Sequence, residues 1–138
     1  KKILVDMSAS IIHHGHIRLL KKASKFGEVI VGLTLDKDLK KFKKINPEIK
    51  FKNREEILRS IKYVKKVVPS SFIINEKFLK KHNINLVVNG SDYKNRKFKI
   101  KSIYFDRTKN ISSSKIRKMA AKNYEKNKKK KILYWFID

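Results

Sequence analysis

The sequence predicts an α/β protein of a single domain, built on an open parallel sheet with helices on both faces. Three observations lead to this expectation. Apolar runs typical of buried strands recur along the chain, segments with helical periodicity lie between them, and 138 residues suit one domain. Strands that alternate with crossover helices form a parallel, Rossmann-like sheet. Hydrophobic residues make up 41% of the sequence, which is enough apolar material for a core.

The first strand, helix and strand are predicted near the N-terminus. Residues 3–5 and 29–35 are apolar and rich in β-branched side chains, as buried strands are. Apolar residues recur between them at helical spacing: Ile17, Leu20, Ala23 and Phe26. We therefore expect a helix over residues 16–25 that crosses from one strand to the next.

The remaining elements are predicted from weaker patterns. A polar, lysine-rich loop that contains Pro47 is expected after the second strand. The next helix should begin at Asn53, because Asn53 and Glu56 have the spacing of a capping box and apolar residues follow at helical intervals as far as Val64. Further strands are expected at residues 67–68, 84–88 and 103–105, with a short helix near 74–79 and a serine-capped helix over 112–122.

Domain organisation and location follow from composition. We place the folded domain at residues 1–122 and predict a basic helical segment at 123–138, which packs on the domain or leads into a further region. The chain lacks cysteine, so disulfides and cysteine-based zinc sites are excluded and a reducing compartment fits. No apolar run approaches the roughly 20 residues that a membrane span needs, and we expect a cytoplasmic protein. Because the sequence does not start with methionine, it is compatible with an excised part of a bifunctional protein.

The net charge of +25 predicts attraction to polyanions of several kinds. The basic residues, most of them lysines, are spread over both halves of the sequence. This distribution favours a solvated lysine-rich surface over a dedicated nucleic-acid face.

A candidate phosphate-binding motif lies where the first predicted strand turns into the first helix. Ligands of open α/β sheets usually bind at this place. Gly15 would let the backbone approach a phosphate, and His13 and His16 can donate hydrogen bonds to the same anion at a helix start. The alternatives are incidental histidines or a metal pair, but the absence of cysteine and of acidic neighbours argues against metal ligation.

The His13-x-Gly15-His16 motif resembles the His-x-Gly-His signature of the nucleotidyltransferase superfamily, and residues 12–20 resemble its small cytidylyltransferases. Residues 107–114, Arg-Thr-Lys-Asn-Ile-Ser-Ser-Ser, are similar to the Arg-Thr-x-x-Ile-Ser stretch that this family places late in the domain. Residues 89–93 are similar to the Gly-Asp-Asp-Trp stretch of its glycerol-3-phosphate branch. A pair of lysines at 43–44, followed by Arg54, is a fourth agreement. The resemblance extends over residues 2–119.

The resemblance implies an enzyme that transfers CMP from CTP to a small phosphorylated alcohol, amine or phosphonate and releases pyrophosphate. It further implies a homodimer, Mg²⁺ bound together with CTP, and no protein side chain as a metal ligand. The residues carried over as catalytic are His13, His16, Lys44 and Arg107. Those carried over as nucleotide-binding are Met7, Ser8, Ala9, Gly15, Lys43, Gly90, Asp92, Thr108, Ile111, Ser112, Ser113 and Ser114. Which of the two adjacent lysines contacts phosphate stays open.

One departure from the family pattern concerns the acceptor. The family reads Gly-Thr-Phe-Asp ahead of the histidine motif, whereas this chain has Met-Ser-Ala-Ser and lacks a carboxylate at Ser10. The Met-Ser-Ala variant resembles cytidylyltransferase domains that act on aminoalkyl phosphonates. Aromatic candidates for holding a cationic acceptor are Tyr93, Tyr104 and Trp135. An adenylyltransferase and a non-catalytic nucleic-acid-binding module are the alternative functions.

Overall fold

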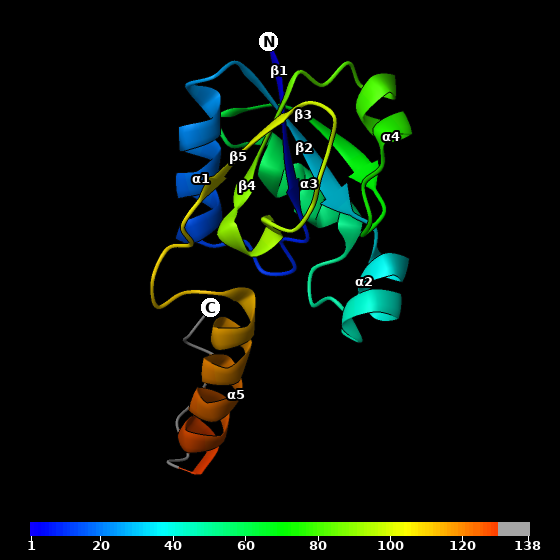
Figure 1. Cartoon of the computed structure of the whole chain (residues 1–138). Coiled ribbons are helices and arrows are strands. Elements are labelled where there is room, and N and C mark those ends of the chain that lie inside the picture. The colour runs from blue at the N-terminus through cyan, green and yellow to red at the C-terminus, as the bar shows by residue number, and fades with distance from the viewer. Residues whose placement is uncertain (130–138) are drawn as a thin grey trace.

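The computed structural model describes residues 1–129 and contains a five-stranded sheet, parallel throughout, in the order β3-β2-β1-β4-β5. The helices alternate with the strands along the chain (Figure 1). The strands are β1 (Lys2–Met7), β2 (Glu28–Thr34), β3 (Val64–Ser70), β4 (Leu86–Gly90) and β5 (Lys101–Phe105). The helices are α1 (His14–Ser24), α2 (Asp36–Lys43), α3 (Phe51–Arg59), α4 (Glu76–Lys81) and α5 (Ser113–Lys129), with a 3₁₀ turn, η1, at Ser91–Tyr93. The predicted fold class is confirmed.

The core lies on both faces of the sheet, with β1 at its centre. On one face Val5 and Val31 pack with Leu20 of α1 and Leu58 of α3, and all four side chains are fully buried. On the other face a second apolar cluster joins strands β1–β4 to α4 and its flanking segments: Leu4, Ile30, Val68, Ile74, Leu79, Ile84 and Val87. Burial on both faces explains why β1 reads as a continuous apolar run instead of an alternating one.

The strand order places a binding crevice beside β1. From β1 the chain continues to β2 and β3 on one side, and it returns to β4 and β5 on the other. Ligands of open α/β sheets bind outside the carboxyl ends of the strands at such a reversal. The segments that follow Met7 at the end of β1 and Gly90 at the end of β4 are therefore the expected walls of a site.

Helix α5 differs from the other elements, because it extends away from the body that holds the sheet (Figure 1). None of its residues is buried. The helix is continuous to Lys129, so the predicted boundary at residue 122 falls within it. Trp135 and the rest of the predicted segment beyond residue 129 lie outside the described residues. Within residues 1–129, the helices lack the length and apolar character that crossing a membrane requires.

The structure corrects the prediction between β2 and β3 in three respects. Residues 36–43, predicted as loop, form α2, whose first turn carries Asp36 and Asp38 where acidic side chains favour a helix. Helix α3 begins at Phe51 without a side-chain cap from its N-cap residue, so the capping box predicted at Asn53 is wrong. The backbone N–H of Phe51 instead donates to Asp36 Oδ2, at 3.2 Å. Val64, predicted as helical, begins β3.

Strand β3 also includes Pro69, at which the sequence pattern ended the strand. Strand β3 is hydrogen-bonded to β2 alone, and Pro69 pairs there with Leu33. As an edge strand, β3 tolerates a residue without an N–H group. The strand therefore continues past the proline to Ser70.

Candidate active site

A cavity of about 440 Å³ opens at the carboxyl edge of the sheet. Segments from both ends of the chain line it, including the loop after β1, the start of α1 and the start of α5. Of the residues predicted for the site, these line the cavity: Met7, Ser8, Ala9, His13, Gly15, His16, Lys43, Gly90, Asp92, Arg107, Thr108, Ile111, Ser112, Ser113 and Ser114. The histidine motif and the late Arg-Thr-x-x-Ile-Ser stretch thus face one space.

Local backbone geometry fixes the two imidazoles. His13 is the N-cap of α1, and its Nδ1 accepts a hydrogen bond from the Gly15 N–H at 3.1 Å. His16 Nδ1 accepts from the His13 N–H at 3.1 Å, and the two ring centroids lie 3.9 Å apart. Because both Nδ1 atoms are acceptors, the proton of each neutral ring is assigned to Nε2. Each ring therefore offers one oriented donor.

Both imidazoles are held neutral at physiological pH. Burial, together with the neighbouring His13, Arg107 and Lys43, lowers the pKa of His16 from 6.5 to about 3. The pKa of His13 is also lowered, first by burial and then by His14 and Arg107. Neutral donors of this kind can stabilise negative charge that develops on a ligand. They are not equipped to act as cationic acids near pH 7.

Gly15 lies between His13 and the late stretch at the start of α1. Its N–H donates to His13 Nδ1 at 3.1 Å. The absence of a side chain also matters at this position. A Cβ at this position would lie 2.9 Å from His13 Cε1 and 3.4 Å from Ile111 Cγ2. Gly15 therefore leaves room for the imidazole of His13 beside the start of the 111–114 segment.

The three serines of residues 112–114 differ in their hydrogen-bond partners. Ser112 Oγ accepts the backbone N–H of Lys115 at 3.0 Å, which is a capping contact at the start of α5. Ser113 Oγ donates to the carbonyl of Ile11 at 2.9 Å and accepts the Ile11 N–H at 3.3 Å. Among residues 1–129, nothing hydrogen-bonds to the hydroxyl of Ser114. Ser114 is thus the serine whose hydroxyl is left for a ligand, beside the N–H groups of the first helical turn.

Of the cationic residues predicted for the site, Arg107 and Lys43 line the cavity. Arg107 follows β5, its side chain is more than half exposed, and it lies 3.8 Å from Asp92. Lys43, at the end of α2, also lines the cavity. Desolvation lowers the pKa of Lys43, whereas the nearby Asp92 acts in the opposite direction. Lys44 does not line the cavity, because it is the C-cap of α2 in the left-handed conformation (φ 58°). The structure therefore favours Lys43 over Lys44 as the phosphate contact.

A buried ion pair beside the cavity was missed by the sequence analysis. Asp6, near the end of β1, pairs with Arg96 from the segment after η1. Burial raises the pKa of Asp6 to about 6 in spite of the opposing charge of Arg96. The guanidinium of Arg96 also lies 4.1 Å above the ring of Tyr93 and donates to the Phe72 carbonyl at 3.2 Å. The available signal was Asp6 itself, a carboxylate at the end of a strongly apolar run.

This pair changes the expectation for the aromatic candidates. Tyr93 lines the cavity, but Arg96 already covers one face of its ring. Tyr104 does not line the cavity, and its hydroxyl donates to the Arg96 carbonyl at 3.0 Å. Of the two described candidates, Tyr93 alone can therefore contact a ligand in this cavity.

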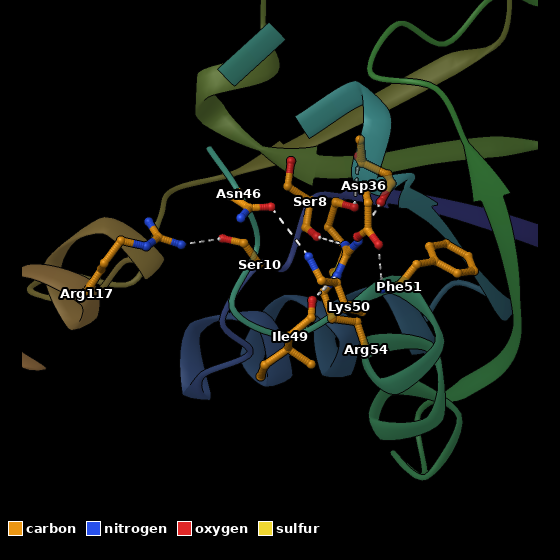
Figure 2. A network of polar contacts seen from close by, with 11 residues as sticks. Ser8, Ser10, Asp36, Asn46, Ile49, Lys50, Phe51, Arg54 and Arg117 are labelled. Carbon is orange, nitrogen blue, oxygen red and sulfur yellow. Dashed lines mark hydrogen bonds and ion pairs between the residues drawn. The ribbon is translucent and has the colours of Figure 1, made fainter. Parts of the chain in front are cut away.

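Arg54 organises the polar wall behind the cavity (Figure 2). Its side chain is fully buried and lies 2.6 Å from the Asp36 carboxylate. The same guanidinium donates to the carbonyl oxygens of Ser8, Thr34 and Ile49, at 2.6, 3.0 and 3.0 Å. It thereby connects the loop after β1, the end of β2 and the loop before α3. These contacts give Arg54 a structural role, because none of its donors points to the ligand space.

The described residues do not form a metal centre by themselves. Residues 1–129 contain no group of three or more His, Asp or Glu side chains placed to hold a metal ion. The carboxylates of Asp6 and Asp92 are each adjacent to an arginine. A divalent ion at this site would need ligand oxygens and water for its coordination, which Mg²⁺ accepts readily.

Comparison with known protein families is consistent with this site. Residues 8–119 match the cytidylyltransferase-like family. The chain belongs to this family. It is similar to glycerol-3-phosphate cytidylyltransferase of Bacillus subtilis, with 30% identity over 128 residues that cover 88% of this chain and 98% of the relative. It is also similar to a probable ethanolamine-phosphate cytidylyltransferase of Encephalitozoon cuniculi, with 30% identity over 95 residues that cover 68% of this chain and 30% of that protein.

A solved structure supports the fold of this cytidylyltransferase-like chain. A lipopolysaccharide core biosynthesis protein from Thermoplasma volcanium aligns with a TM-score of 0.66 and 17% identity, covering 78% of this chain and 97% of that one. The resemblance stated from the sequence motifs is confirmed at the level of the family. The chain is therefore a nucleotidyltransferase.

Proposed function

We propose that the protein transfers CMP from CTP to a small phosphorylated or phosphonate acceptor and releases pyrophosphate. One observation carries the proposal. The two neutral imidazoles and the Arg107–Ser114 stretch line a single cavity at the carboxyl edge of β1 and β4. Several donors around one space suit a triphosphate, whose charge is spread along its length. The similarity to enzymes named for cytidylyl transfer supports the choice of CTP.

The reaction requires positioning and charge stabilisation. An acceptor phosphate or phosphonate oxygen attacks the α-phosphorus, the bond from that phosphorus to the bridging oxygen breaks, and pyrophosphate leaves with the electron pair. Negative charge grows on the reacting and leaving oxygens. His13 and His16 offer Nε2–H donors there, while Lys43 and Arg107 supply positive charge. No covalent enzyme intermediate is required.

Mg²⁺ enters this proposal as part of the substrate. CTP carries the ion on its phosphate oxygens, where it offsets their charge. Catalysis by this chain then rests on the imidazoles, Lys43 and Arg107, which hold the nucleotide in line with the acceptor. A homodimer remains part of the proposal through the family resemblance.

The dimensions of the cavity support a small acceptor. Ser8 and Ala9 place small side chains on its wall, and a volume of about 440 Å³ must hold both substrates. Glycerol 3-phosphate, phosphoethanolamine and 2-aminoethylphosphonate therefore remain the acceptors to compare. The nucleic-acid alternative is less favoured, because the donors gather inside a cavity whereas a nucleic-acid face needs an exposed surface.

The test is pyrophosphate release from Mg·CTP, with Mg·ATP as the competing donor and these three acceptors plus phosphocholine. We expect release with CTP that depends on an acceptor, and a product that contains CMP joined to that acceptor. Turnover with ATP in place of CTP, or salt-sensitive binding of DNA without any turnover, would overturn the proposal. His82→Ala serves as a control, because His82 is the C-cap of α4 and does not line the cavity.

A further inference from the structure

Helix α5 is attached to the rest of the protein by few contacts, although its first turn carries part of the candidate site. Ser113 and Ser114 line the same cavity as the histidines. No residue of α5 is buried, so apolar packing does not fix its position. The polar contacts of Ser113 with Ile11 and those of Arg117 are what connect its first two turns to the body. The geometry of the site therefore depends on these contacts.

Arg117 joins α5 to two separate segments. Its guanidinium holds Glu48 in a fork, with Nε 2.5 Å from Oε2 and Nη2 2.8 Å from Oε1. The same Nη2 donates to Ser10 Oγ at 3.2 Å (Figure 2). Arg117 stands four residues after Ser113, so both side chains leave the same face of the helix. The hydrogen bond from Arg117 lowers the pKa of the Glu48 carboxyl, as expected for a charged partner.

The partners of Arg117 are themselves held in place. Glu48 lies next to Ile49, whose carbonyl accepts from the buried Arg54 side chain. Ser10 is buried and lines the cavity two residues after Ser8, whose carbonyl accepts from the same Arg54. The Arg54 network thus fixes the platform on which Arg117 rests. A bidentate arginine–carboxylate pair adds a defined direction to such a contact.

We propose that Arg117 is a positioning residue that clamps the start of α5 against Glu48 and Ser10, and so sets the distance between Ser114 and the two imidazoles. The inference rests on the proposed nucleotidyl transfer and assigns a further residue to it. Arg117 itself lines the cavity, but its Nε and Nη2 are bonded to Glu48 and Ser10, so its role is to position α5. Ser10 occupies the position at which the family pattern has aspartate, and the carboxylate partner comes instead from Glu48 on another segment.

The clamp has a distinct experimental signature. The pair is partly exposed, so its loss should have only a small effect on folding stability. A displacement of the order of 1 Å in a catalytic arrangement costs about 10²-fold in rate. Glu48→Gln should therefore reduce kcat/KM by about 10-fold or more, chiefly through a higher KM for CTP, while the melting temperature changes little.

A rescue variant distinguishes loss of the clamp from a nonspecific effect of the Glu48→Gln substitution on the protein. In Ser10→Asp/Glu48→Gln, the new carboxylate lies where Arg117 Nη2 already reaches Ser10, so the clamp should re-form and KM should recover. Glu55→Gln is the matched control, because Glu55 pairs with exposed Arg59 within α3 by a similar contact and does not line the cavity. We expect this control to behave like the unaltered protein.

Hydrogen exchange provides a readout that does not need turnover. Backbone amides of residues 113–118 should exchange faster in Glu48→Gln and in Arg117→Ala, and return to slow exchange in the rescue variant. Unchanged exchange and unchanged KM in Glu48→Gln would overturn the clamp while leaving the proposed transfer intact. If the unaltered protein lacks transferase activity, the proposed function fails, whereas the exchange pattern still decides whether the clamp exists.

Discussion

Gly15→Ala probes how closely the imidazole of His13 is fitted to the site. The added methyl group would lie 2.9 Å from His13 Cε1 and 3.0 Å from its Nδ1. Because carbon atoms in contact prefer separations of about 3.5 Å or more, the ring must retreat by roughly 0.5 Å. The methyl group also lies 3.4 Å from Ile111 Cγ2, which limits the directions in which the backbone can adjust.

The size of the effect follows from this displacement. A misplacement of about 1 Å costs on the order of 10²-fold in rate, so half of it should reduce kcat by about 10-fold. Stability should move in the other direction or not at all. Gly15 lies in the first turn of α1, and alanine is a better helix former than glycine by about 0.5–1 kcal/mol in a helix interior. The variant should therefore stay folded and lose activity.

The assay is pyrophosphate release at saturating Mg·CTP, with thermal unfolding of the same samples and His82→Ala measured alongside. Full activity in Gly15→Ala would refute the reasoning, because the imidazole would then tolerate the displacement. Activity that disappears together with the folded state would refute it as well, since the reasoning predicts separate effects on rate and stability.

Three further predictions concern buried ionisable side chains. Arg54→Leu should lower the free energy of unfolding, measured in urea, by about 3 kcal/mol or more, because it leaves Asp36 and buried carbonyls unpaired. Arg59→Ala removes an exposed pair and should cost less than about 1 kcal/mol in the same measurement. The pKa of His16 is about 3 in the folded protein, so the stability that depends on neutral His16 is complete above pH 6.5 and is lost as the pH falls. His16→Ala should therefore reduce the slope of the unfolding free energy against pH, measured between pH 7 and 5, by up to about 1.4 kcal/mol per pH unit. Arg96→Gln should raise the pKa of Asp6 above about 6, because it removes the charge that opposes desolvation, and carboxyl-carbon NMR would contradict this if the pKa stayed or fell.

Local sequence patterns were sufficient to predict the sheet, and the resemblance to nucleotidyltransferase motifs predicted most of the cavity residues. The buried strands are continuous apolar runs, and the motif residues follow the ends of β1 and β5, where a parallel sheet gathers its ligands. His13, His16 and Arg107 therefore reach one cavity, as their positions suggested. The sequence could not decide between Lys43 and Lys44, because the outcome depends on a left-handed residue at the end of α2.

The features missed from the sequence depend on contacts between distant segments. Helix α2 buries little beyond Leu39 and Asp38, so its lysine-rich sequence resembles a loop. The start of α3 is capped by Asp36, 15 residues earlier, and no local capping rule can identify such a partner. The pairs Asp6–Arg96 and Glu48–Arg117 join segments 90 and 69 residues apart. Periodicity and spacing carry no information about these pairs.

The most direct test of the account follows labelled phosphate from CTP. With [α-³²P]CTP, Mg²⁺ and a phosphorylated acceptor, the label should appear in the conjugate of CMP and acceptor, whereas label from [γ-³²P]CTP should appear in pyrophosphate. His16→Ala and Arg107→Ala should each reduce both transfers by about 10²-fold or more, because their side chains serve the same triphosphate. Label transfer that persists at full rate in either variant would contradict the claim that the histidine motif and the Arg107–Ser114 stretch act on one nucleotide.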